Sequence, residues 1–131
     1  MHIVPFYAAL LALLFVALSV RTLYLRRTLH IAVGDGGNAT MLRAMRVHSN
    51  FAEYVPFSLI LFFLIEQSGA HSSVVHLYCA SLLCGRVIHA FGVSQVKERF
   101  AFRVAGMALT LGPLLTAALR LLGQSSVWGW A

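Results

Sequence analysis

Hydrophobic residues run along this chain in four long blocks separated by short polar segments. The blocks cover approximately residues 3–25, 41–67, 73–93 and 104–122. Each block is long enough to cross the hydrocarbon core of a bilayer, which takes about 20 apolar residues in a helix. Short connections between consecutive blocks require neighbouring helices to run in opposite directions. We therefore predict an all-α membrane protein, with residues 1–131 forming a single domain, an antiparallel bundle of four transmembrane helices.

The composition supports this class. Hydrophobic residues make up 60% of the chain and charged residues only 11%, whereas a soluble domain has about 25% charged residues. The net charge of +6 comes from residues at the block ends rather than from a basic stripe on a soluble fold, so we expect no nucleic-acid partner. Cys79 and Cys84 have a spacing that fits neither a zinc site nor a redox pair, and we expect no metal.

Basic residues are concentrated in two of the three loops. The first loop and its flanks carry Arg21, Arg26, Arg27, Arg43 and Arg46, and the third carries Lys97, Arg99 and Arg103. The second loop carries no Lys or Arg. By the positive-inside rule, loops one and three face the cytoplasm and both termini face outwards. Trp128 and Trp130 follow the fourth block, where we expect them to anchor the chain at the interface.

The second block contains polar residues that a lipid-facing helix would exclude. Arg43, Arg46, Asn50 and Glu53 follow one another at steps of three, four and three residues. At 100° per residue they fall within an arc of roughly 80° on one helix face. An ionisable side chain in the middle of a membrane helix costs about 2.5–3.5 kcal/mol on insertion scales. This polar stripe must therefore face other helices, another subunit or a hydrated cavity.

The third block adds Arg86 and His89, three residues apart and on one helix face. We expect Arg86 to neutralise Glu53. The remaining acidic residues, Asp35, Glu66 and Glu98, lie in loops or at block ends. The other arginines near the stripe then have no acidic partner, and this surplus of positive charge indicates an anionic ligand that carries carboxylates. The alternative interpretation is that the stripe only fixes helix packing.

The segment RVHSNFAEYVP, residues 46–56, resembles the second-helix signature of the MAPEG family, the membrane-associated proteins of eicosanoid and glutathione metabolism. That signature has an arginine, an asparagine four residues later, a glutamate three residues after that, and a closing proline. Length, four spans and topology agree along the whole chain. The turn over residues 34–37 is similar to that of small bacterial members. The resemblance implies a homotrimer in the bacterial inner membrane.

The family also implies a glutathione site between neighbouring subunits near the cytoplasmic face. Glu53 would then receive the α-amino group of glutathione, and Arg46 its carboxylates. His89 stands where better-known members have a tyrosine, as does Val93. Arg103 is similar to the family arginine that holds the glutathione sulfur as a thiolate. The positions implied to contact glutathione are Arg26, Arg27, Arg46, Asn50, Glu53, Tyr54, Arg86 and His89.

The implied activity is that of a glutathione transferase or peroxidase that acts on a lipophilic small molecule or lipid. A free thiol has a pKa of about 8.5, and a nearby cation favours the nucleophilic thiolate. The generic Leu, Val and Phe of the lipid-facing positions do not identify the electrophile. Two alternatives are a non-catalytic membrane scaffold and a small multidrug-resistance-type transporter. The transporter needs a carboxylate in its first helix, and residues 3–25 contain none.

Overall fold

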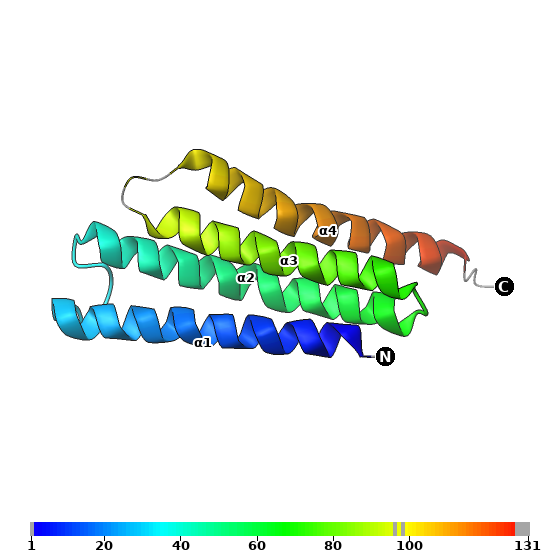
Figure 1. Cartoon of the computed structure of the whole chain (residues 1–131), viewed down its shortest axis with the longest axis horizontal. Helices are drawn as coiled ribbons and strands as arrows, with labels where there is room; N and C mark the ends of the chain where they lie inside the picture. Colours follow the sequence, from blue (N-terminus) through cyan, green and yellow to red (C-terminus); the bar gives the residue numbers. More distant parts are fainter. Residues whose placement is uncertain (1, 96, 98, 128–131) are drawn as a thin grey trace.

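The computed structural model describes residues 2–95, 97 and 99–127, so Trp128 and Trp130 lie outside it. It contains the four expected helices, α1 (Ile3–Leu29), α2 (Ala39–Gln67), α3 (Ser72–Ser94) and α4 (Phe100–Val127). They lie side by side as an elongated bundle in which consecutive helices run in opposite directions (Figure 1). All four are long and apolar enough to cross a membrane. The all-helical, four-span architecture predicted from the sequence is confirmed.

The first helix continues four residues past the predicted end at residue 25. Its last turn carries Arg26 and Arg27, and positive side chains are favourable near the negative end of a helix dipole. His30 then adopts a left-handed conformation with φ 54° and stops the helix. The apolar pattern had marked the end of the hydrophobic stretch, whereas the polar last turn extends the helix beyond it.

The connection from α1 to α2 is a glycine turn followed by a side-chain cap. Gly34, Gly36 and Gly37 all have positive φ values, which residues with a Cβ rarely adopt. Asn38 is the N-cap of α2, because its Oδ1 accepts hydrogen bonds from the amides of Thr40 and Met41 at 3.0 Å each. This cap starts α2 at Ala39, two residues before the predicted boundary.

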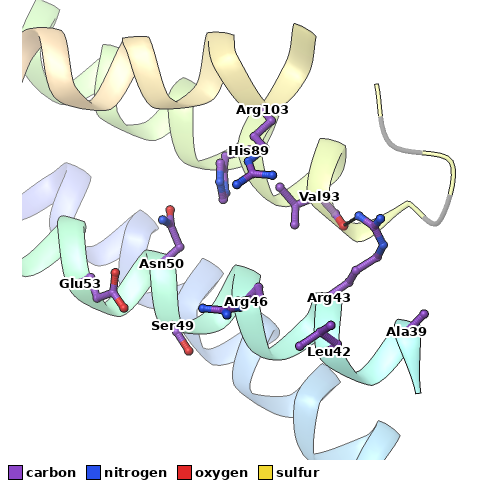
Figure 2. A pocket seen from close by; sticks show the side chains of 10 residues that line it. All are labelled: Ala39, Leu42, Arg43, Arg46, Ser49, Asn50, Glu53, His89, Val93 and Arg103. Carbon is purple, nitrogen blue, oxygen red and sulfur yellow. Dashed lines mark hydrogen bonds between the residues drawn. The ribbon is translucent and has the colours of Figure 1, made fainter. Parts of the chain in front are cut away.

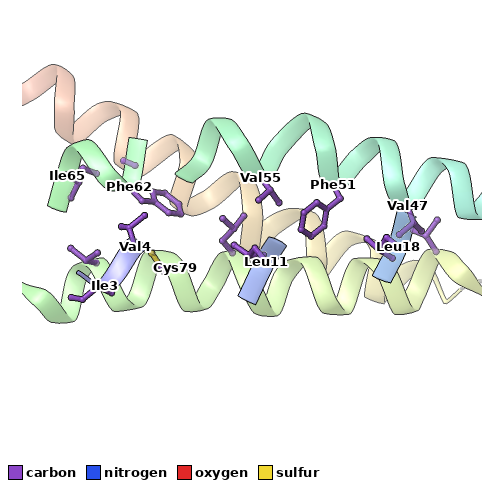
Figure 3. Close-up of a cluster of buried hydrophobic side chains, with 14 residues drawn as sticks. Ile3, Val4, Leu11, Leu18, Val47, Phe51, Val55, Phe62, Ile65 and Cys79 are labelled. Carbon is purple, nitrogen blue, oxygen red and sulfur yellow. The ribbon is translucent and has the colours of Figure 1, made fainter. Parts of the chain in front are cut away.

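The apolar core fills the space between α1, α2 and α3. Leu11, Phe62 and Cys79 are fully buried, and Figure 3 shows side chains of α1 and α2 meeting along the length of the bundle. The outward faces are also apolar. Leu13, Leu23, Phe57 and Leu115, for example, are more than half exposed. Such a surface is suited to lipid or to further subunits.

Helix α4 packs against α3 and α2, and its described residues do not contact α1. Glycines allow the backbones of α3 and α4 to approach closely, as small residues do in membrane bundles. A Cβ added to Gly85 would lie 2.9 Å from the carbonyl oxygen of Gly106, and one added to Gly92 would lie 2.7 Å from Cβ of Phe102. These glycines therefore determine how α4 is seated on the bundle.

At the end of the bundle where α1 begins and α2 ends, Glu66 of α2 links these two helices (Figure 1). Its carboxylate accepts hydrogen bonds from the backbone amides of Ile3 and Val4 in the first turn of α1. These amides have no acceptor within their own helix. Glu66 thus caps a helix from a position more than sixty residues away, a contact that the sequence did not suggest.

Candidate functional site

A polar cavity of about 550 Å³ opens between α2, α3 and α4. It lies at the end of the bundle that carries the α1–α2 and α3–α4 connections (Figures 1 and 2). We call this end the basic end, because most of the arginines are here. The cavity is lined by Ala39, Leu42, Arg43, Arg46, Ser49, Asn50 and Glu53 of α2, His89 and Val93 of α3, and Arg103 of α4.

The α2 wall of the polar cavity is the stripe recognised in the sequence. Arg46 and Glu53 are both exposed towards the opening, and Asn50 lies between them on the same face (Figure 2). Neither Arg46 nor Glu53 makes a hydrogen bond or ion pair with another residue that the structure describes. A carboxylate and a guanidinium that are not used by the fold remain available for groups of opposite charge on a ligand.

The facing wall is built by α3 and α4. His89 is 5% exposed and lies beside Arg103, whose guanidinium is next to the imidazole (Figure 2). At the mouth, Nη1 of Arg43 donates a hydrogen bond to the carbonyl oxygen of Val93 at 3.2 Å. Arg43, Arg46 and Arg103 thus give the cavity three guanidinium groups against the single carboxylate of Glu53.

Arg86 is the most deeply buried charged side chain near the cavity, with 2% of its surface exposed. Its Nη1 donates to Oδ1 of Asn50 at 2.5 Å, and its Nη2 donates to the carbonyl oxygen of Gly106 at 3.3 Å. Its guanidinium also lies 5.8 Å from the centre of the Tyr54 ring. The structure differs here from the expected pairing with Glu53, because Arg86 meets α2 at Asn50, almost one turn earlier.

Arg86 and Tyr54 therefore lie behind Asn50 and do not line the polar cavity. Tyr54 follows Glu53 by one residue, and a step of 100° turns its side chain away from the cavity towards α3. The contact of either residue with glutathione stays a prediction.

The two arginines at the end of α1 are outside the cavity of a single chain. Nη1 of Arg26 donates to the carbonyl oxygens of Ala32 and Gly34, at 3.4 and 3.0 Å, and so holds the α1–α2 connection. Arg27 is exposed. Since a site between subunits would include residues of a neighbouring chain, the predicted role of both arginines remains open to test.

Some lining residues were not among the predicted contacts. Ser49 sits next to Asn50, and Ala39 and Leu42 form the mouth. The helical period that identified the stripe also points to Ala39 and Leu42, which lie four residues before Arg43 and Arg46 respectively, but they lack a polar group to mark them. In the described part of the chain, no group of three His, Cys, Asp or Glu side chains could hold a metal ion.

An apolar groove runs between α2 and α4 beyond the polar cavity, towards the other end of the bundle. Its volume is about 820 Å³, and its lining is Phe57, Leu61, Leu111, Leu114, Leu115, Ala118, Leu121 and Leu122. Phe57 follows Glu53 by four residues, which places it one turn further along the same face of α2. The α2–α4 side of the bundle therefore changes from charged to apolar within one helical turn.

Four membrane-length helices around a cavity with an Arg–Asn–Glu stripe are the arrangement implied by the sequence signature. The chain belongs to the MAPEG family, which it matches over residues 4–123. It is 36% identical over 113 residues to the inner membrane protein YecN of Escherichia coli, a match that covers 86% of this chain and 85% of that protein. The protein of the same name from a second Escherichia coli strain matches equally well. Membership of this family leaves the multidrug-resistance interpretation without support.

Proposed function

We propose that this protein binds glutathione in the polar cavity and uses its thiolate to attack lipophilic electrophiles, as a transferase or a peroxidase. The observation that carries the proposal is the charge pattern of the cavity, with Arg43, Arg46 and Arg103 around one carboxylate, Glu53. Glutathione has two carboxylates, one ammonium group and a thiol. Its charges therefore complement those of the cavity.

The distribution of roles follows from the same pattern. Glu53, which has no partner among the described residues, binds the ammonium group, and Arg46 on the same helix face binds a carboxylate. Arginine suits both carboxylate binding and thiolate stabilisation, because it stays protonated and presents several donors in a fixed plane. Arg103 on the facing wall holds the sulfur as a thiolate, which is the reactive form of a thiol.

The electrophile approaches along the apolar groove between α2 and α4. The groove begins one turn beyond Glu53 and carries Phe57 and leucines, so a lipophilic molecule would leave the bilayer there without losing apolar contacts. The glutathione sulfur and the electrophile then meet at the boundary between the charged and the apolar surfaces. This arrangement accounts for a polar cavity opening beside an apolar wall.

Three copies of the chain form the working unit in this proposal, and the basic end faces the cytoplasm. The open side of the polar cavity exposes Arg46 and Glu53, and a neighbouring subunit would close it. Arg26 and Arg27 of that neighbour would then add positive charge to the site. The cytoplasmic orientation rests on the clustering of Arg and Lys in the first and third loops.

Calorimetric titration of glutathione into the detergent-solubilised oligomer tests the proposal. We expect saturable binding that Glu53→Gln and Arg46→Ala each weaken by about tenfold to a hundredfold, since each removes a hydrogen bond to a charged group. Arg99→Ala is the matched control, because Arg99 is exposed in the described structure, lies next to α4 and does not line the cavity. An intact oligomer that does not bind millimolar glutathione would overturn the proposal and favour a non-catalytic role.

A further inference from the structure

The orientation of the Asn50 side-chain amide determines what the centre of the polar cavity can bind. An asparagine amide has an acceptor end, Oδ1, and a donor end, Nδ2, whereas a guanidinium has only donors. Because Arg86 donates to Oδ1 of Asn50, the acceptor end is turned towards α3. Nδ2 makes no hydrogen bond with a residue that the structure describes, although Asn50 lines the cavity.

Arg86 is itself held in place on several sides. It is 2% exposed, its Nη2 donates to the carbonyl oxygen of Gly106, and the Tyr54 ring lies beside its guanidinium. Reversing the Asn50 amide would bring the Nδ2 donor against a guanidinium donor and leave a buried Nη1 without an acceptor. An unsatisfied buried polar group is costly, most of all for a charged one. The amide of Asn50 is therefore locked in one orientation.

We propose that Arg86 is a positioning residue that makes Asn50 a fixed hydrogen-bond donor into the polar cavity, so that the ligand must present a carbonyl or carboxylate oxygen there. This inference rests on the proposed function and makes it more specific. Glutathione would meet Asn50 with a carboxylate or peptide carbonyl oxygen, and its ammonium group would be directed to Glu53. Two residues of one helix, three positions apart, would thereby distinguish an acceptor from a donor on the same ligand.

Asn50→Asp separates the two functions of this side chain. Aspartate has nearly the same shape, keeps an acceptor for Arg86 and gives the buried guanidinium an opposite charge. It replaces the donor that faces the cavity with an oxygen. We expect the melting temperature of the oligomer to stay the same or rise, while the affinity for glutathione falls by about tenfold or more. Loss of affinity without loss of stability would separate a role of this side chain in ligand binding from a role in the fold.

Arg86 is tested by a pair of substitutions. Arg86→Met removes every donor and leaves the Asn50 amide able to rotate, so glutathione binding should weaken. Arg86→Lys restores a donor to Oδ1 and should recover part of the affinity, measured on oligomers of confirmed size. If the methionine variant does not fold, Asn50→Asp alone decides the question.

The outcomes distinguish this inference from the proposed function. Equal glutathione affinity in the native protein and Asn50→Asp would overturn the inference and leave the proposed function standing. Absence of binding to the native oligomer would overturn both. Weaker binding by Asn50→Asp with unchanged or higher stability supports both.

Discussion

Gly106 lies directly against His89. A Cβ built on Gly106 would come within 2.7 Å of Cβ of His89 and within 2.8 Å of the carbonyl oxygen of Gly85. Real side chains do not approach so closely, so α4 reaches its observed position only because residue 106 has no side chain. Arg103 lies one turn before Gly106 on the same helix, and the close approach brings its guanidinium beside His89 at the cavity wall.

Gly106→Ala should therefore damage both stability and the site. The added methyl group forces α4 away from α3, and overpacking of this kind typically costs about 1–3 kcal/mol. Thermal unfolding in detergent, with glutathione titration of the folded fraction, measures the two effects. Gly112→Ala is the control in the same helix, because nothing lies within 4 Å of the added Cβ. Equal melting temperatures for the two variants would contradict the packing argument.

Glu66→Gln should lower stability and leave glutathione binding unchanged. The substitution removes a negative charge and one strong acceptor from the first turn of α1, which costs about 0.5–2 kcal/mol for comparable caps. Glu53→Gln should leave stability unchanged and weaken glutathione binding, since Glu53 has no partner in the described structure. Melting curves measure the stability of both variants, and calorimetry measures their affinity for glutathione. A large loss of stability in Glu53→Gln would show that its carboxylate belongs to the fold.

Arg103→Gln should reduce turnover by about a hundredfold, the usual effect of removing one group that stabilises a developing or resident anion. The ultraviolet absorbance of the thiolate, recorded when glutathione binds, reports the cause directly. Arg103→Lys keeps the positive charge and should recover part of that signal. Arg99→Gln, a neighbour outside the cavity, should behave like the native protein. A full thiolate signal in Arg103→Gln would assign thiol activation to another group.

The membrane orientation is open to chemical labelling. In a background with Cys79 and Cys84 replaced by alanine, a single cysteine at Gln67 should react with an impermeant maleimide added to intact spheroplasts. A cysteine at Ala32, in the α1–α2 connection at the basic end, should react only after the membrane is broken. Both positions are exposed, so accessibility within the protein does not explain a difference. Reversed labelling would place the cavity on the outer side.

Hydropathy alone predicted the number of helices and placed four of their eight limits within one residue, whereas α4 begins four residues earlier and ends five residues later than predicted. Apolar blocks mark the residues that lipid covers. A helix can continue beyond them, because its ends are set by capping residues. The left-handed His30 and the Asn38 cap therefore moved two boundaries that hydropathy had placed elsewhere. The sequence shows Gly85 and Gly106, but whether they contact each other depends on the position of α4 along the axis of α3.

Residues on one helix face were predicted more successfully than pairs on different helices. Arg46, Asn50 and Glu53 line one wall, as their spacing requires. The partner of Arg86 was not predictable, because it depends on the height of α3 relative to α2, and the turn between them sets this height. A shift of less than one turn exchanges Glu53 for Asn50. For Arg26 and Arg27, the sequence of one chain does not reveal which neighbouring surface they meet.

The cap that Glu66 provides for Ile3 has a consequence for biogenesis. The acceptor for the first amides of α1 is synthesised more than sixty residues after them, and these amides have no acceptor within their own helix. The cap on the first turn of α1 therefore forms only after α2 has been synthesised to its last turn. A chain that ends before residue 66 would form α1 without this cap, so the first helix acquires part of its stability only from the second.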